Sequence, residues 1–125
     1  MQRRFRLRRR DDFQATLAAG RLYAGPTLIA FARPRAEPPT RVGVTVSRRL
    51  RGAVRRNRAR RRVREAARLR LRLDLGQGPD DLGSAGSGIP YDVVLIARPA
   101  AVDREFAALL RDAERVAARL APAPA

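Results

Sequence analysis

The charge of residues 48–72 constrains what this chain can fold into more than any other feature of the sequence. The segment reads RRLRGAVRRNRARRRVREAARLRLR, with thirteen arginines and one acidic residue, so it carries a net +12 of the formal +16 of the whole chain. Arginines at this density repel one another, and folding them together costs free energy unless a polyanion neutralises them. The segment therefore predicts a surface that binds a polyanion.

The composition is that of one folded domain with a nucleic-acid partner. Of the 125 residues, 45% are hydrophobic, which is normal for a folded chain and enough for a single core. Nucleic acid is the expected partner of so cationic a domain, with an anionic membrane a distant second. Every basic residue is arginine, and a GC-rich genome explains this bias as well as a need for guanidinium groups does.

Several kinds of catalytic and metal site are excluded by what the sequence lacks. Without cysteine the chain has no disulfide framework, thiolate nucleophile or cysteine zinc site, and without histidine it lacks the usual general base. The twelve acidic residues are scattered, and no two of them are placed as a general acid and base. We therefore expect no catalytic residue and no protein metal site. Neither a signal-peptide apolar stretch nor a membrane-spanning run is found, so a cytoplasmic protein is expected.

The first half of the chain is expected to hold one helix and three strands. Residues 1–10 form a basic arm, and a helix is predicted at Asp12–Ala19, with Asp11 as its N-cap and Gly20 as its terminator. Short segments rich in branched and aromatic residues and bounded by proline predict strands. These segments are Leu22–Ala24, Thr27–Arg33 and Arg41–Ser47.

The second half is expected to add a basic helix, a central strand and a last helix. The helix is predicted at Ala53–Arg72, and the strand at the strongly apolar Tyr91–Ala97. Between them, residues 76–90 have the composition of a flexible linker loop. Asp103 is predicted to cap a last helix, which ends at Pro122 before a disordered tail at 121–125. The order α-β-β-β-α-β-α predicts a single domain over residues 1–120, of the α+β class or a mixed α/β sandwich, on one small sheet.

The basic helix is expected to have two different faces. At 100° per residue, the small apolar residues Ala59, Val63, Ala66, Ala67 and Leu73 gather on one side. Another side carries Asn57, Arg61, Arg64 and Arg68, with Arg60 beside them. This pattern predicts a helix that is packed on a core and presents a continuous cationic stripe to a ligand.

Several separated motifs resemble one known family. The basic segment continues a strand in RVGVTVSRRLRGAVRRNRARRRVRE at 41–65, where Arg56-Asn57-Arg58 forms an RNR motif. The entry to the first helix reads RLRRRDDF at Arg6–Phe13, and the central strand continues as DVVLIARP at Asp92–Pro99. With these motifs in this order, residues 3 to about 120 resemble the bacterial ribonuclease P protein component family.

The resemblance implies both a fold and a function. It implies a central mixed sheet, an RNR helix in a left-handed βαβ crossover, and a cleft between the sheet and the first helix. Left-handed crossovers are rare, so periodicity alone does not predict this one. The family member is the protein subunit of a ribonucleoprotein endoribonuclease that removes the 5′ leader from precursor tRNA. The implied partners are the ribonuclease P RNA and precursor tRNA, and the implied cofactor is Mg²⁺ bound mainly by the RNA, which carries the catalysis.

The resemblance also assigns two sets of site residues. The RNA-binding helix is represented by Arg56, Asn57, Arg58, Arg60, Arg61 and Arg64, and Arg68 continues its stripe. The leader-binding cleft is represented by Phe13, Phe31, Val44, Val46 and Arg48. Guanidinium groups bind phosphates bidentately, and aromatic faces stack on bases of any sequence.

Some of these assignments have an alternative explanation in the residues themselves. Arg58 lies on a different side of the helix from the stripe and is as readily explained as a solvated residue. Arg62 and Arg70 are equally well explained as side chains that extend over the core. Phe13 and Phe31, taken in isolation, could be core residues. In addition, Leu17 stands where many family members have an aromatic residue.

Three other functions fit the charge less completely. A small ribosomal protein with a basic helix shares the charge and size, but it does not explain the ordered motifs. A DNA-binding module would pair two helices, whereas strands precede the basic helix here. A helix lying on an anionic membrane would need large apolar residues opposite the arginines, and alanine and valine stand there instead. We therefore expect neither DNA nor a membrane as partner.

Overall fold

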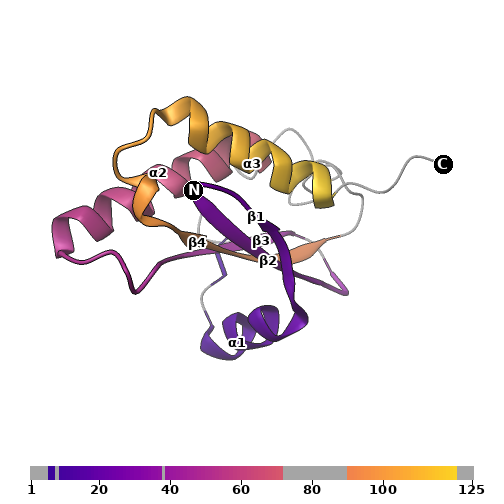
Figure 1. The fold of residues 1–125 in the computed structure, drawn as a ribbon. Helices are drawn as coiled ribbons and strands as arrows, with labels where there is room; N and C mark the ends of the chain where they lie inside the picture. The colour runs from indigo at the N-terminus through magenta and orange to yellow at the C-terminus, as the bar shows by residue number, and fades with distance from the viewer. Residues whose placement is uncertain (1–5, 8, 38, 72–89, 121–125) are drawn as a thin grey trace.

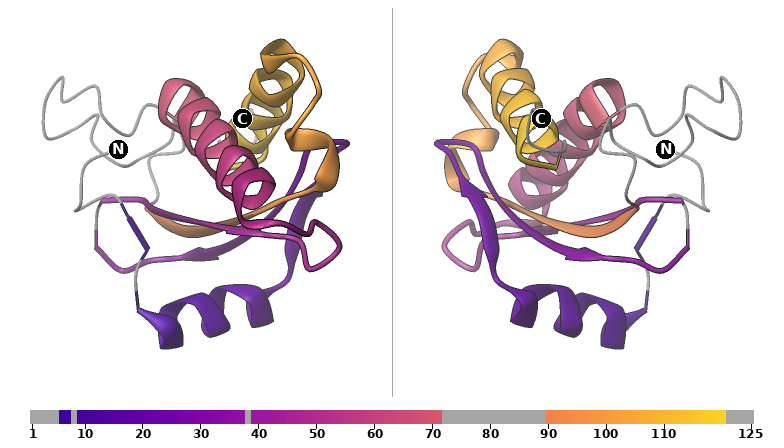
Figure 2. Two further views of the ribbon diagram at one scale, coloured as in Figure 1. Left: turned by 90° about the vertical axis from the view of Figure 1, so that its left-hand side faces the viewer. Right: turned by 90° about the vertical axis from the view of Figure 1, so that its right-hand side faces the viewer.

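A four-stranded sheet separates one helix from two others (Figure 1 and Figure 2). The computed structural model describes residues 6–7, 9–37, 39–71 and 90–120. In chain order the elements are α1 (Arg10–Ala19), β1 (Arg21–Ala24), β2 (Leu28–Pro34), β3 (Arg41–Val46), α2 (Ala53–Leu71), β4 (Tyr91–Ala97), the 3-10 turn η2 (Pro99–Ala101) and α3 (Phe106–Leu120). The predicted order of helices and strands is confirmed, and η2 is an addition to it. The predicted loop at 76–90, except Pro90, and the predicted tail at 121–125 lie outside the described residues.

The sheet is mixed, with the strand order β1-β2-β4-β3. β4 pairs antiparallel with β2 and parallel with β3, so it is the central strand that its apolar sequence predicts. The parallel pair needs a long connection between its strands, and α2 lies within that connection. Within the described residues, no helix combines the length and the apolar character needed to cross a membrane.

The core lies between the sheet and the pair of helices α2 and α3, which lie side by side on one face (Figure 2). α2 contributes small side chains, as its sequence predicts: Ala59, Val63, Ala66 and Ala67 are fully buried. The sheet contributes Leu28, Ala30, Val42, Val93, Leu95 and Ala97, and α3 contributes Leu109, Ala113, Val116 and Leu120. Leu73, the fifth predicted core residue of the basic helix, lies outside the described residues.

Two predicted helix caps are wrong. α1 begins at Arg10 after an extended Arg9, so Asp11 lies inside the first turn instead of capping it. There it still faces the positive end of the helix dipole. Asp103 is exposed and lies in the turn between η2 and α3, three residues before α3 begins at Phe106. Gly20 ends α1 with φ 113, which confirms the predicted terminator, because only glycine adopts this conformation without strain.

A buried carboxylate fixes α3 over the turn between β1 and β2. Asp112 accepts hydrogen bonds from the hydroxyl of Tyr23 at 2.6 Å and from the backbone N–H of Thr27 at 2.9 Å, as well as from the Thr27 hydroxyl. A Cβ atom on Gly25 would lie 2.3 Å from Asp112 Oδ1, so only glycine fits in this turn. Burial, and then the hydrogen bond to Asp112, raise the pKa of Tyr23. The sequence pattern of α3 does not reveal this polar anchor within its apolar face.

Candidate nucleic-acid interface

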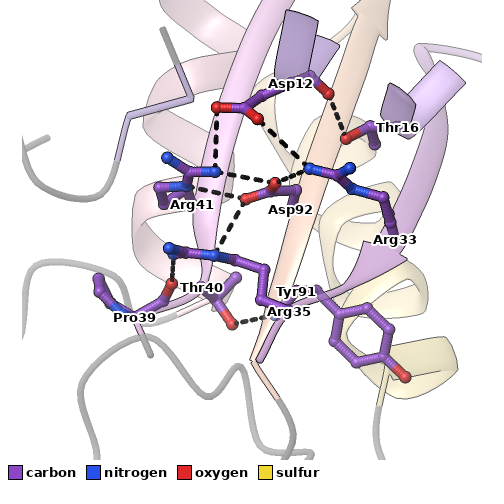
Figure 3. A network of polar contacts seen from close by, with 9 residues as sticks. All are labelled: Asp12, Thr16, Arg33, Arg35, Pro39, Thr40, Arg41, Tyr91 and Asp92. Carbon is purple, nitrogen blue, oxygen red and sulfur yellow. Dashed lines mark hydrogen bonds and ion pairs between the residues drawn. The ribbon is translucent and has the colours of Figure 1, made fainter. Parts of the chain in front are cut away.

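An ionic network holds α1 on the other face of the sheet (Figure 3). Asp92 of β4 is fully buried, and Arg41 of β3 binds it with two hydrogen bonds of 2.9 Å, from Nε to Oδ1 and from Nη2 to Oδ2. Arg33 of β2 donates to Asp92 Oδ2 at 2.9 Å. The same two arginines reach Asp12 of α1, at 3.4 Å from Arg33 and 3.3 Å from Arg41. Three strands and α1 are thus joined through one buried carboxylate.

The charges of this network stabilise one another. Burial acts to raise the pKa of Asp92, but the hydrogen bonds from Arg41 and Arg33 outweigh it and hold this pKa below its usual value. The hydrogen bond to Asp92 raises the pKa of Arg41 in turn. Asp92 is therefore an anion at neutral pH that orients the two arginines, and these arginines join α1 to the sheet.

Phe13 of α1 lies directly on the backbone of β3. A Cβ atom on Gly43 would lie 2.3 Å from Phe13 Cζ, so the ring occupies the space that any larger residue would need. The ring borders a pocket of about 180 Å³, which is also lined by Val44 of β3, Arg6 and Arg64 of α2. Two predicted surfaces meet here, because Phe13 and Val44 were assigned to the cleft and Arg64 to the basic helix. The cationic side of this pocket, which Arg6 and Arg64 form, is not recognisable in the sequence, because these two residues are far apart in the chain.

Strand alternation divides the remaining predicted cleft residues between the two faces of the sheet. Phe31 is half-buried and pairs with Val94, on the face toward α1. Val46 pairs with Ala97 and is buried in the core on the opposite face. Val44 pairs with Leu95 and shares this core-facing side with Val46, although it also lines the small pocket at the edge strand β3. The assignment of Val46 to a cleft between the sheet and α1 is therefore wrong, and Val44 reaches such a cleft only at the edge of the sheet. Arg48 is exposed in the loop after β3.

A larger hollow of about 540 Å³ lies beside the ends of the strands. Ile29 and Ile96, which are paired across β2 and β4, form an apolar floor on the same face as Phe31. Its other lining residues are Pro26, Ser47, Arg49, Arg98, Pro99 and Ala100. We call this the strand-end hollow. The hollow is not among the predicted sites, although the alternation of Ile29 and Phe31 in TLIAFAR places both on one face.

The predicted stripe on α2 is present, with several degrees of exposure. Asn57 and Arg61 are exposed, whereas Arg60, Arg64 and Arg68 are half-buried. Arg60 donates to Asn57 Oδ1 at 2.9 Å, and Arg68 pairs with Glu65 at 2.5 Å. Burial, and then the charges of Arg6 and Arg60, lower the pKa of Arg64. The guanidinium groups therefore repel one another around Arg64, and an anion at this position would relieve the repulsion.

Other arginines of the basic helix are bound to the protein itself. Arg56 donates from Nη1 to the carbonyls of Ser47 and Leu50, and Arg58 donates from Nε to the carbonyl of Val102. Arg62 lies along the core and donates to three carbonyls of the segment that joins β4 to α3. Arg70 pairs with Glu114 of α3 at 2.8 Å. Arg58, Arg62 and Arg70 thus each have an acceptor within the protein, and a contact of any of them with RNA stays a prediction.

The described acidic residues do not gather as a metal site. No group of three or more His, Cys, Asp or Glu residues in the described ranges could hold a metal ion. The two carboxylates that are buried in the described part of the chain, Asp92 and Asp112, are surrounded by internal hydrogen-bond donors.

Comparisons with known proteins agree with this architecture. A sequence model of the Ribonuclease P family matches residues 1–121. The ribonuclease P protein component of Chloroflexus aurantiacus is 41% identical over 128 residues, which cover 99% of this chain and 84% of that relative. The corresponding protein of Caulobacter vibrioides is 39% identical over 117 residues, which cover 93% of this chain and 70% of that relative. A mutant RNase P protein of Staphylococcus aureus has a similar fold, with a TM-score of 0.67 at 24% identity over 90% of this chain and 85% of that one. This chain belongs to the ribonuclease P protein family.

Proposed function

We propose that this chain is the RNA-binding protein subunit of a ribonuclease P and promotes removal of the 5′ leader from precursor tRNA. The observation that carries the proposal is the presence of two surfaces with different chemistry on one domain. One is the cationic stripe of α2, and the other is the apolar face beside α1 with arginines at its edge. Two such surfaces suit two RNA ligands, a folded catalytic RNA and a single-stranded leader.

The stripe of α2 is the proposed contact with the ribonuclease P RNA. Arg60, Arg61 and Arg64 offer guanidinium forks to phosphates, and Asn57 can both donate and accept a hydrogen bond. Because α2 packs on the core through small side chains, this row of cations is held in place before the RNA arrives. Preorganised cations bind phosphates with a smaller loss of side-chain entropy.

The face beside α1 is the proposed contact with the leader of precursor tRNA. Phe13 and Phe31 offer aromatic surface, and the strand-end hollow adds the apolar floor of Ile29 and Ile96. Arg49 and Arg98 border this hollow, where they can meet the phosphates of a strand whose bases lie on the apolar floor. Such a combination binds single strands with little sequence preference, which a leader of variable sequence requires.

The chemistry of cleavage is proposed to belong to the RNA subunit. When bound to that RNA, magnesium ions supply the charge that activates water and stabilises the leaving oxygen. The protein's own Asp92 and Asp112 are engaged by arginine, tyrosine and threonine, so these carboxylates are not available as ligands. The protein contributes binding and orientation of the two RNA ligands.

Reconstitution with a ribonuclease P RNA tests the proposal. At low magnesium, where RNA alone reacts slowly, adding the protein should raise the rate of precursor tRNA cleavage. Protein without RNA should leave the substrate intact, even after repurification under nuclease treatment. A protein that binds the RNA but does not change cleavage at any magnesium concentration would fit a structural RNA-binding protein and contradict the proposal.

A further inference from the structure

Three arginines of the basic helix donate hydrogen bonds to the backbone of two loops. Arg56 Nη1 lies 3.0 Å from the carbonyl oxygen of Ser47 and 2.8 Å from that of Leu50, in the loop that follows β3. Arg62 lies 2.6 Å from the carbonyl oxygen of Ala101, 3.0 Å from that of Val102 and 2.6 Å from that of Arg104, in the segment that joins β4 to α3. Arg58 Nε adds a second bond to Val102, at 3.0 Å.

The same two loops form the walls of the strand-end hollow. Ser47 and Arg49 line it from the loop after β3, and Arg98, Pro99 and Ala100 line it from the segment after β4. Among the carbonyls bound by these arginines, that of Ser47 belongs to a wall residue, and the others lie one to four residues from a wall residue along the chain. α2 therefore holds the backbone that adjoins the walls. Ala101 is the last residue of η2 and Val102 follows it, so their carbonyls lie at the end of the turn, where helical carbonyls need donors from outside.

The geometry suits arginine and leaves Arg62 little capacity for a second ligand. A guanidinium presents its donors in a fixed planar fork, and Arg62 uses both of its terminal nitrogens on carbonyls. Its side chain is half-buried, and burial, followed by the charge of Arg58, lowers its pKa. Arg61, the next residue, is exposed and points to a different side of the helix.

We infer that Arg56 and Arg62, assisted by Arg58, are positioning residues that set the shape of the strand-end hollow, and that they do not serve as phosphate contacts of α2. The identity of the hollow's occupant, a single-stranded leader, rests on the function proposed above. The two arginines of the RNR motif then shape the leader surface, and the contact with the catalytic RNA belongs to Asn57, Arg60, Arg61 and Arg64.

The neighbours Arg62 and Arg61 give a matched pair of variants, Arg62→Ala and Arg61→Ala. Each is assembled with a ribonuclease P RNA, and two quantities are measured: the salt dependence of RNA binding, and the ratio of affinities for leader-bearing and leaderless tRNA. Arg62→Lys is the third variant, because it keeps the charge and removes the fork. Circular dichroism is used to find a temperature at which all three variants are folded. If Arg62→Ala is not folded at any temperature, Arg62→Lys is compared with Arg61→Ala instead.

The two positions are expected to give opposite results. Arg61→Ala should make the log–log salt slope shallower by about 0.7, the value for one phosphate contact on a single strand, and should keep the leader ratio. Arg62→Ala should keep the salt slope and lower the leader ratio by roughly tenfold, as expected for losing hydrogen bonds worth about 1.4 kcal/mol together. Arg62→Lys should also lower the ratio of affinities for leader-bearing and leaderless tRNA. If Arg62→Ala makes the slope shallower and lysine restores both quantities, Arg62 is a phosphate contact and the inference is wrong.

Amide hydrogen exchange in the free protein tests the same contacts without RNA. In the wild type, the amides of Ala101, Val102 and Arg104 are hydrogen-bonded within their own segment. Exchange at these amides should become faster in Arg62→Ala and Arg62→Lys and should stay unchanged in Arg61→Ala. Unchanged exchange in both Arg62 variants would overturn the inference. A wild-type complex without any leader preference would instead refute the proposed leader site. The exchange rates would still show whether Arg62 holds the segment that joins β4 to α3.

Discussion

The two faces of the sheet are attached to their helices by different kinds of interaction. Toward α2 and α3 the contact is apolar and continuous, and residues such as Val63 and Leu95 are fully buried. Toward α1 the ring of Phe13 packs on β3, and an ionic network is added, in which Asp12 meets Arg33 and Arg41 around the buried Asp92. One face stabilises the fold, and the other leaves apolar sheet surface beside a firmly placed helix. A ligand surface can therefore be exposed without loss of the core.

The largest effect on stability is expected from removing the carboxylate of Asp92, which belongs to the ionic contact with α1. Asp92→Asn leaves Arg33 and Arg41 without their shared anion, and breaking a buried ion pair on one side costs about 3–5 kcal/mol. Urea unfolding of the variant should show a loss of this size. The matched control is Asp12→Asn, which removes a partly exposed partner and should cost about 1 kcal/mol or less. Equal losses in the two variants would mean that Asp92 is not the centre of the network.

A smaller effect is expected where α1 meets β3. Gly43→Ala places a methyl group against Phe13 Cζ, and overpacking of this kind costs about 1–3 kcal/mol. It should also displace the ring and lower the preference for leader-bearing tRNA. The double variant Gly43→Ala with Phe13→Leu removes the clashing atom, so it should recover stability but not leader preference. A Gly43→Ala protein as stable as the wild type would contradict the close seating of the ring.

Lowering the pH should reduce the free energy of unfolding by a still smaller amount, through the ionic contact with α1. The folded state lowers the pKa of Asp92, so its contribution to stability is complete above the unfolded value of about 3.9 and is lost as the pH falls through the folded value. The free energy of unfolding should therefore decrease below about pH 4, by at most about 1.4 kcal/mol per pH unit from this group. Asp92→Asn should show a shallower decrease. An identical pH profile in the two proteins would refute the linkage.

The parts of the fold that were predictable from the sequence are those determined by local pattern. The small-residue face of α2, the terminator Gly20 and the central strand Tyr91–Ala97 each follow from spacing or from residue type at one position. The network around Asp92 was not predictable, because it depends on the register between β2, β4 and β3, which are far apart in the chain.

The candidate site was only partly predictable for a related reason. Helical phase separates Arg61 from Arg62, but it does not identify the carbonyls that Arg62 binds, which lie about forty residues later in the chain. The period of two in β3 places Val42, Val44 and Val46 on one face, which packs on the core, so it could have argued against both Val44 and Val46 as cleft residues. The strand-end hollow could not be foreseen, because two loops from distant segments form it.

Binding of leader-bearing and leaderless tRNA to assembled complexes tests the separation of the two RNA surfaces most directly. Complexes are prepared with the wild type, with Phe31→Ala, and with the double variant Arg60→Ala and Arg61→Ala, whose residues lie outside the pocket of Phe13, after circular dichroism has shown that each protein is folded. Phe31→Ala should assemble normally and lose leader preference by about 1–3 kcal/mol, the value of one stacked base. The arginine variant should assemble weakly with either tRNA and keep the preference once saturated. If folded Phe31→Ala keeps the full preference, or if the arginine variant assembles as well as the wild type, the two surfaces do not have the separate roles described.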